Sequence, residues 1–270
     1  VGGVLATHPL VRKISFTGST ETGRLLLRQS ADTVKKTSME LGGNAPFIVF
    51  DDADLDAAVE GAMASKYRNG GQTCVCANRI FVQRAVYDEF ADKLIERVKK
   101  LKVAPGEREG AEIGPLINQR ALDKVEHLVE AATREGAAVL TGGARHEAGD
   151  LFYAPTVLTG VRNDMEIARA EIFGPVASLI AFDTEEEVIR DANDTIYGLA
   201  AYIFTRDLGR AWRMGEALEF GMVGVNEGVI SSAAAPFGGV KQSGMGREGS
   251  KYGIEDYLEV KYLCLGGLDQ

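Results

Sequence analysis

Short runs of apolar and β-branched residues alternate along the chain with longer stretches in which apolar residues recur every three or four positions. The short runs predict strands over residues 13–16, 47–50, 79–83, 176–182, 199–204 and 222–225. The longer stretches predict helices over residues 21–29, 54–67, 86–98, 122–132, 184–192 and 208–218. Strand–helix–strand succession of this kind predicts an α/β fold, with a largely parallel sheet covered by helices.

A different pattern appears near the C-terminus, where apolar residues occupy every second position from Leu258 to Cys264. Alternation with period two is typical of a strand, and no helical pattern follows it. A strand at the edge of a sheet exposes unpaired backbone groups, which favour pairing with another chain. The sequence therefore predicts an edge strand that joins subunits.

Composition and charge exclude several classes of protein. The 270 residues suggest about two domains, and 45% hydrophobic with 26% charged residues is typical of a globular protein. A net charge of −9 argues against nucleic acid or an anionic membrane as the main partner. No run approaches the roughly 18 apolar residues of a membrane span. The 32 glycines, about 12% against an ordinary 7%, indicate tight turns or backbone held close to a ligand.

The number of cysteines and the first residues of the chain give expectations about the cellular compartment and about whether the chain is part of a longer polypeptide. Three cysteines make no closed disulfide framework, so we expect a reducing compartment, which is the cytoplasm or, in a eukaryote, the mitochondrial matrix. The chain begins at Val1 with an apolar, glycine-containing run and no secretory leader. We therefore expect it to be part of a longer polypeptide.

Two cysteines, Cys74 and Cys76, lie in the polar loop sequence GQTCVC at 71–76, between a predicted helix and a predicted strand. Loop side chains on a rigid scaffold often carry chemistry, whereas two small buried hydrophobes are the structural alternative. A zinc site is not indicated, because Cys264 and the three histidines show no pairing at metal-ligand spacing. We expect no metal.

Three further motifs leave alternatives open. In MELGGNAP at 39–46, Glu40 fits a general base on a flexible turn and equally a solvated carboxylate. In FTGST at 16–20, Ser19 fits a phosphate-binding helix N-terminus and equally a plain N-cap. The sequence GMGREG at 244–249 matches G-x-G-x-x-G, but no predicted strand precedes it, so we interpret it as a chance match to the dinucleotide fingerprint.

Five motifs in a fixed order carry a family resemblance: FTGS at 16–19, ELGG at 40–43, GQTC at 71–74, EIFGP at 171–175 and PFGG at 236–239. Together they resemble the NAD(P)-dependent aldehyde dehydrogenase superfamily along essentially the whole chain. The longer strings GQTCVCAN at 71–78 and GSKYGIEDY at 249–257 are similar to its succinate-semialdehyde branch. The resemblance implies the α/β catalytic domain of that family.

The resemblance also implies a division of the chain. Residues 1–39 are expected to end a Rossmann-type cofactor-binding domain, residues 40–236 to form the catalytic domain, and residues 237–270 to form a C-terminal return and oligomerisation segment. Members of the family are longer at the N-terminus and form homodimers or homotetramers. We therefore expect the full-length protein to be an enzyme and these 270 residues alone to be inactive, as a non-catalytic association domain would be.

The catalytic roles implied by the resemblance fall on Cys74 and Glu40. Cys74 would attack the aldehyde to give a thiohemiacetal, hydride would pass to NAD or NADP, and Glu40 would activate the water that hydrolyses the remaining thioester. A free thiol has a pKa of about 8.5, so the site must activate it. The Cys74 backbone N–H would donate to the oxyanion.

The cofactor contacts implied by the resemblance come from three of the five motifs. Gly18 and Ser19 would lie near the pyrophosphate, and Leu41 would contribute backbone contacts. Glu171 would contact the nicotinamide ribose, and Phe173 would pack near the nicotinamide. The choice between NAD and NADP is left open.

The substrate contacts implied by the resemblance are Arg68 and Ser231, which would bind the carboxylate of a semialdehyde, and Phe237, which would line the tunnel. The alternative for Arg68 is a cation that stabilises the end of the preceding helix. Succinate semialdehyde, or a homologue such as glutarate semialdehyde, is the expected substrate, and a neutral aldehyde is the alternative. Cys76 is a candidate for a disulfide with Cys74 that would block the nucleophile under oxidation.

Overall fold

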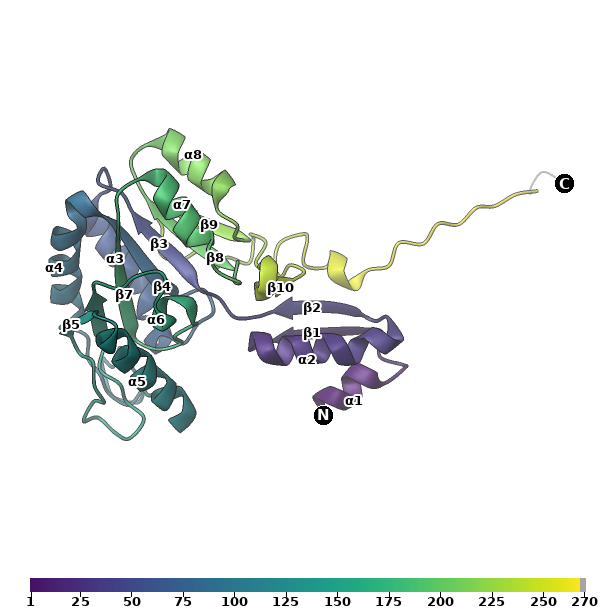
Figure 1. Ribbon diagram of the computed structural model, residues 1–270. Coiled ribbons are helices and arrows are strands. Elements are labelled where there is room, and N and C mark those ends of the chain that lie inside the picture. The colour runs from purple at the N-terminus through teal and green to yellow at the C-terminus, as the bar shows by residue number, and fades with distance from the viewer. Residues whose placement is uncertain (268–270) are drawn as a thin grey trace.

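The computed structural model describes residues 1–267, which form two sheets of different size (Figure 1). The smaller sheet has three strands in the order β1-β2-β10, with β1 parallel to β2 and β10 antiparallel to it. Two helices, α1 and α2, accompany it (Figure 1). The bounds of these elements are Gly2–Thr7 for α1, Lys13–Thr17 for β1, Thr20–Ser30 for α2, Lys36–Glu40 for β2 and Gly244–Met245 for β10.

The larger sheet has seven strands in the order β5-β6-β7-β4-β3-β8-β9, and every neighbouring pair is parallel except β5 with β6. Its strands are β3 (Ala45–Val49), β4 (Ala77–Gln83), β5 (Ala138–Thr141), β6 (Thr156–Thr159), β7 (Val176–Phe182), β8 (Ala200–Phe204) and β9 (Met222–Val225). Its helices are α3 (Leu55–Lys66), α4 (Tyr87–Val98), α5 (Gln119–Arg134), α6 (Glu166–Arg169), α7 (Glu185–Asn193) and α8 (Leu208–Ala217). Short 3-10 turns cover Ala31–Thr33, Arg68–Gly71, Arg84–Val86, Lys241–Ser243 and Glu255–Tyr257.

Both faces of the larger sheet are buried under helices. Alternate residues of β3 point to opposite faces, so Phe47 and Val49 join one apolar cluster with α3 and α4. Ile48 lies in the other cluster, which includes the apolar faces of α5, α7 and α8. Burial on both faces explains why the strands read as continuous apolar runs in the sequence. The predicted α/β fold with a mostly parallel sheet flanked by helices is confirmed.

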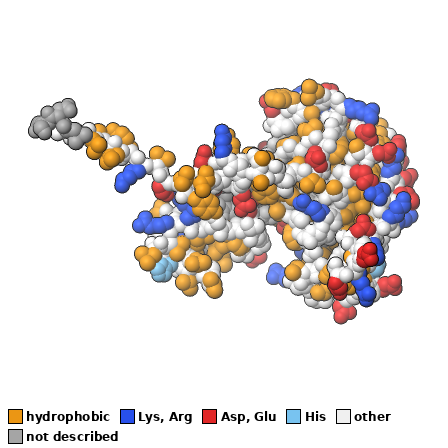
Figure 2. All heavy atoms as spheres, turned by 180° about the vertical axis from the view of Figure 1, so that it is seen from behind, with side chains coloured by type: hydrophobic (Ala, Val, Ile, Leu, Met, Phe, Trp, Pro, Cys, Tyr) orange, Lys and Arg blue, Asp and Glu red, His pale blue; other side chains and the backbone are white. Residues whose placement is uncertain are grey.

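The predicted edge strand over Leu258–Cys264 is wrong for the single chain. This segment leaves the body as an extended, exposed stretch beyond the small sheet (Figures 1 and 2). It pairs with no strand among residues 1–267, and its first residues contact the small sheet through Lys36, which donates to the Leu258 carbonyl at 3.1 Å and forms an ion pair with Glu259 at 3.0 Å. A strand requires a hydrogen-bonded neighbour, which a period-two pattern cannot supply by itself.

The packing of the chain, and not nucleotide binding, explains why GMGREG begins with glycine. Gly244 and Met245 form β10 against Glu40 and Met39 of β2. A Cβ on Gly244, where φ is +126°, would lie 1.8 Å from the Met39 carbonyl oxygen, so only glycine permits this approach. Among the described residues after the motif only a 3-10 turn forms, at Glu255–Tyr257, so no α-helix opens there as the dinucleotide fingerprint requires.

The C-terminal residues therefore return to the first sheet, through β10. The chain crosses from the small sheet to the large one between Glu40 and Ala45, next to the predicted boundary at residues 39 and 40. The three-segment division itself stays a prediction, and residues 268–270 of its last segment lie outside the described residues. Across the described part of the chain, no helix combines the length and apolar character that a membrane crossing demands.

Candidate active site

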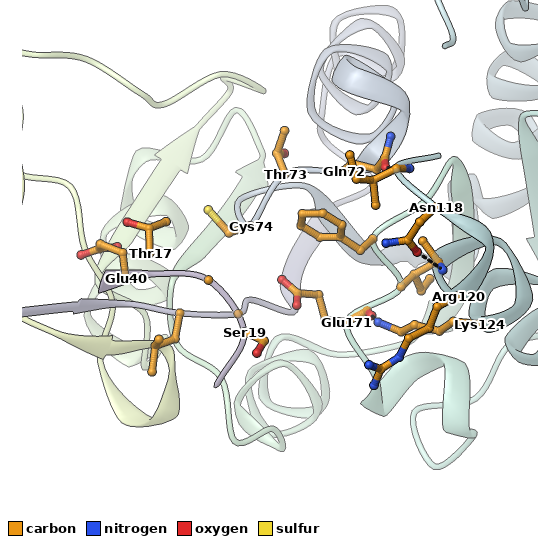
Figure 3. Close-up of a pocket in the computed structure, with 17 residues that line it drawn as sticks. Thr17, Ser19, Glu40, Gln72, Thr73, Cys74, Asn118, Arg120, Lys124 and Glu171 are labelled. Carbon is orange, nitrogen blue, oxygen red and sulfur yellow. Dashed lines mark hydrogen bonds between the residues drawn. The ribbon is translucent and has the colours of Figure 1, made fainter. Parts of the chain in front are cut away.

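A cavity of about 620 Å³ lies at the crossing from the small sheet to the large one (Figure 3). Its walls come from the turn between β1 and α2, the end of β2, the loop before β4, the start of α5 and the segment before β7. It brings together seven residues that the sequence singled out: Gly18, Ser19, Glu40, Leu41, Cys74, Glu171 and Phe173.

Glycines of three motifs pack the loop that carries Cys74 against its neighbours. A Cβ on Gly71, where φ is +74°, would lie 2.1 Å from the Gly174 carbonyl oxygen. A Cβ on Gly43 would lie 2.1 Å from the Cys74 carbonyl oxygen. Both glycines therefore allow backbone contacts that any side chain would prevent. The Tyr202 hydroxyl donates to the Val75 carbonyl at 2.7 Å and fixes the other side of the loop.

The Cys74 thiol is half-buried and free. Burial, followed by the nearby carboxylate of Glu171, raises the pKa of this thiol to about 11. A thiol with that pKa is protonated at neutral pH, so nucleophilic attack requires a proton acceptor or a change in its surroundings.

Glu40 is the last residue of β2 and is only 5% exposed, which excludes a solvated carboxylate. Burial, followed by repulsion from Glu248, raises its pKa to about 8, while Arg247 acts in the opposite direction. Its Oε2 atom has no hydrogen-bond partner among the described residues. A buried carboxyl with a pKa near the working pH is suited to accept a proton.

Glu171 is held on the opposite side of Cys74 from Glu40 (Figure 3). Its Oε1 atom accepts a hydrogen bond from the Gly43 N–H at 2.9 Å, and Lys124 donates to its backbone carbonyl at 2.5 Å. Burial is the main reason that its pKa is raised. Its carboxyl is therefore oriented by the same glycine that borders the Cys74 loop.

Ser19 has the N-cap role that was one of its two alternatives, and the phosphate-binding alternative stays a prediction. It is the N-cap of α2, where its Oγ accepts from the Thr22 N–H at 3.3 Å, and it also lines the cavity. Its hydroxyl proton donates to Thr22 Oγ1 at 3.0 Å, so a phosphate oxygen would have to replace Thr22 as the acceptor.

The three predicted substrate residues do not line this cavity. Arg68 is exposed and borders a separate cavity of about 620 Å³ with Tyr67, Lys100 and Val229. Ser231 lies in an exposed loop, and Phe237 is half-buried against the apolar cluster of α3 and α4. Their roles stay predictions.

Cys76 is buried behind the loop and does not line the cavity. Its Sγ lies 2.6 Å from Thr73 Oγ1 and 3.8 Å from the Lys66 carbonyl oxygen. A disulfide between Cys74 and Cys76 would therefore require the loop to rearrange, and both thiols are free here. Within residues 1–267, no group of three or more His, Cys, Asp or Glu side chains could hold a metal ion.

Several residues that line the cavity were not predicted from the sequence. Gln72 connects the Cys74 loop to the segment before α5, since its side chain accepts from the Ile117 N–H at 3.0 Å and donates to the Pro115 carbonyl at 3.2 Å. Asn118 caps α5, and Arg120 and Lys124 follow it on that helix. The capping Asn was the one feature of the sequence that could have indicated these residues. Charged residues on a helix are otherwise expected to face solvent.

Comparisons with known proteins show which proteins the chain is similar to. The sequence profile described as the aldehyde dehydrogenase family matches residues 1–263. A probable succinate-semialdehyde dehydrogenase [NADP(+)] of Sinorhizobium fredii is 61% identical over 99% of this chain and 55% of its own length. A glutarate-semialdehyde dehydrogenase of Pseudomonas aeruginosa is 58% identical over 99% of this chain and 56% of its own length. The solved succinate-semialdehyde dehydrogenase of Burkholderia pseudomallei matches with a TM-score of 0.97 and 63% identity, over 98% of this chain and 55% of that one. The chain thus spans about half the length of these relatives.

Proposed function

The chain belongs to the aldehyde dehydrogenase family, and from this premise we propose that it is the catalytic part of an NAD(P)-dependent dehydrogenase that oxidises a carboxylate-bearing aldehyde. The observation that carries the proposal is the cavity that Cys74 and Glu40 share with Glu171. A nucleophile and a carboxyl with a raised pKa are the two groups that acyl transfer through a thioester requires.

In the first step Cys74 Sγ bonds to the aldehyde carbon, and the thiol proton passes to a base. The Cys74 backbone N–H donates to the oxygen that gains negative charge. Because burial favours the protonated thiol, attack at neutral pH requires this proton transfer. The resulting thiohemiacetal holds the hydrogen that must leave as hydride.

The residues of the cavity fit a nicotinamide cofactor. Its volume lies within the range of about 300–1,000 Å³ that ligand pockets occupy, and Ser19, Glu171 and Phe173 offer a hydroxyl, a carboxyl and an aromatic ring. When bound, NAD or NADP supplies the hydride acceptor. Glu171, oriented by the Gly43 N–H, would accept hydrogen bonds from the ribose hydroxyls.

Glu40 then acts on the thioester. Its carboxylate form takes a proton from water, the water oxygen bonds to the acyl carbon, and the bond from that carbon to Cys74 Sγ breaks to release the acid. Burial of Glu40 raises its pKa, which strengthens it as a base but reduces the fraction that is ionised below pH 8.

The proposed substrate is succinate semialdehyde or a homologue such as glutarate semialdehyde. The names of the relatives at about 60% identity support a semialdehyde. Arg68, with Ser231, would bind the distal carboxylate, and Phe237 would line the approach. The Arg68 guanidinium makes no ion pair within residues 1–267, which leaves it free for such an anion.

A neutral aldehyde is the second candidate, because Arg68 borders a different cavity from Cys74. Kinetics of Arg68→Leu in the full-length polypeptide separate the two. We expect the KM for succinate semialdehyde to rise far more than the KM for hexanal. Equal effects on both would favour the neutral substrate.

The proposal is tested by the variants Cys74→Ser and Cys76→Ser in the full-length polypeptide. Cys74→Ser should abolish aldehyde-dependent NAD(P)H formation, since a hydroxyl in this place is a far weaker nucleophile. Cys76→Ser should retain turnover, because Cys76 lies outside the cavity, and should lose sensitivity to peroxide if the disulfide forms. Turnover by Cys74→Ser at the wild-type rate would refute the mechanism.

The whole protein is further proposed to be a homodimer or homotetramer in the cytoplasm or mitochondrial matrix. The exposed segment from Leu258 onward supports association, because its apolar side chains lack cover within the described chain. Residues 1–270 alone are proposed to be inactive, because the relatives are about twice as long.

A further inference from the structure

Arg120 occupies a position that the stability of its own helix does not explain. It is the second residue of α5, and the first turn of this helix contains no acidic residue. The N-terminus of a helix carries a partial positive charge, so a cation there is unfavourable. The neighbouring residues Asn118 and Gln119 suit a helix start, whereas Arg120 opposes it.

The Arg120 guanidinium also has no partner in the protein. It forms no ion pair and no hydrogen bond with any residue from 1 to 267, although it lines the cavity around Cys74. At the other end of α5, Arg134 pairs with Glu130 at 3.8 Å. Arg120 is thus exposed at the cavity without a partner among the described residues, whereas the equally exposed Arg134 is paired.

A second cation accompanies Arg120 one helical turn later. Lys124 lines the same wall and donates to the Glu171 backbone carbonyl, so its ammonium is held in place (Figure 3). Desolvation lowers the pKa of Lys124, the Glu171 carboxylate raises it, and the charge of Arg120 lowers it further. Two like charges therefore converge on one wall, at a free-energy cost that a bound anion would offset.

The wall formed by Gly18 and Ser19 completes the arrangement. In Figure 3, Arg120 and Lys124 extend from α5 on the side of Glu171, and Ser19 lies between them and Glu40. The exposed Ser19 hydroxyl donates to Thr22 Oγ1 at 3.0 Å and must turn away from it to donate to a ligand, and Gly18 beside it is exposed as well. An anion between these walls would have a hydroxyl on one side and a guanidinium on the other.

We propose that Arg120 binds the diphosphate of the nicotinamide cofactor, as the cationic wall of a clamp whose other wall is the Gly18–Ser19 turn. This inference rests on the proposed function, since it assigns a further residue to the same cofactor. A planar guanidinium donates two parallel hydrogen bonds to phosphate oxygens, which an ammonium cannot do. Lys124 orients the Glu171 segment beside it and adds positive charge.

The test compares Arg120→Gln and Arg120→Lys with the control Arg134→Gln in the full-length polypeptide, with circular dichroism as the check on folding. Isothermal titration measures Kd for NADP and for ADP-ribose, which has the diphosphate and lacks nicotinamide. We expect Arg120→Gln to raise both Kd values about 10-fold and to reduce their dependence on salt. Arg120→Lys should recover part of the loss, and Arg134→Gln should leave both values unchanged.

Two results would overturn the inference. The first is a Kd for ADP-ribose that changes less than twofold in Arg120→Gln. The second is a higher KM for the carboxylate aldehyde alone, which would assign Arg120 to the substrate. Neither result touches the proposed function, because Cys74→Ser tests turnover separately and should retain ADP-ribose binding.

Discussion

At the scale of single residues, the cavity holds its two reactive groups in their neutral forms. The pKa of Cys74 is raised to about 11 and that of Glu40 to about 8, in both cases chiefly by burial. Burial favours the protonated form of both groups. In the proposed mechanism each group must lose its proton before it acts, so the proposed reaction should depend on pH.

We expect thioester hydrolysis to accelerate as the pH rises through about 8, because Glu40 acts as a base only after it ionises. Stopped-flow measurement of the deacylation rate from pH 6 to pH 10 checks this. Glu40→Gln should be slow at every pH and should lack this titration. A wild-type rate that is independent of pH over that range would rule out Glu40 as the base.

The same shift has a consequence for stability. The folded-state pKa of Glu40 lies above its unfolded value of 4.5, so the folded protein binds this proton more tightly. The contribution of this bound proton to the free energy of unfolding is complete below pH 4.5 and is lost as the pH rises to about 8. The free energy of unfolding should therefore fall less over that window in Glu40→Gln than in wild type.

Lys66 is a second buried titratable residue, and the proposed mechanism does not use it. It is 1% exposed, and its Nζ has no hydrogen-bond partner among the described residues. Burial lowers its pKa below 10.5, so the unfolded chain binds more protons and stability should rise as the pH approaches 10.5. Urea unfolding of Lys66→Met should show equal or greater stability than wild type and a flatter pH dependence.

A matched control is Lys99→Met. The Lys99 side chain is exposed, so its replacement should leave the pH dependence of stability unchanged. A loss of more than about 2 kcal/mol in Lys66→Met would contradict the account, since it would require a favourable interaction of the buried amine.

At the scale of elements, close backbone contacts between motifs position the nucleophile. The connection from β2 to β3 passes so near the Cys74 loop that Gly43 has no room for a Cβ. The buried Arg79 of β4 stabilises the same region, because its guanidinium donates to the Asn44 side chain at 3.0 Å and to the carbonyls of Asp191 and Ala192. Sequence motifs that look separate are thus parts of one packed unit.

We expect Gly43→Ala to reduce kcat by at least about 10-fold, since its Cβ would displace the Cys74 carbonyl and with it the nucleophile. Gly215→Ala is the control, because no heavy atom lies within 4 Å of its Cβ and alanine favours the α8 helix by about 1 kcal/mol. Steady-state kinetics and thermal unfolding of both variants check this. Equal activity of the two would show that the contact at Gly43 is unimportant.

The larger strands could be predicted from the sequence because burial on both faces makes them continuous apolar runs. Strands β2, β5, β6 and β10 were missed. For example, β2 reads KTSME and owes its place to pairing with β1 and β10. Glu40 and Cys74 were predicted from motifs rich in glycine, and the close backbone contacts in the structure explain why glycine is needed there. Arg120 and Lys124 were missed because only the tertiary fold turns their face of α5 toward the cavity.

At the scale of the whole molecule, the C-terminal segment from Leu258 to Gly267 contributes little to the folded body. Apolar side chains along it are exposed, including Val260, Tyr262 and Leu263 (Figure 2). An exposed apolar, extended segment favours association with another chain. The sequence pattern predicts this association, which stays a prediction, but it could not show that the segment lacks a strand partner within the described chain.

Deletion of residues 258–270 from the full-length polypeptide should therefore lower the oligomeric state with little change in unfolding temperature. Analytical ultracentrifugation and scanning calorimetry measure the two quantities. An unchanged oligomer would contradict the proposed role of the segment.

The central claim is that an acyl group is carried by Cys74 and released by Glu40. Its most direct test is mass spectrometry of the full-length Glu40→Gln variant after mixing with succinate semialdehyde and NADP. The account predicts a succinyl group on the peptide that contains Cys74, formed with about one equivalent of NADPH per site. Hydrolysis at the wild-type rate, or an acyl group on any residue other than Cys74, would contradict it.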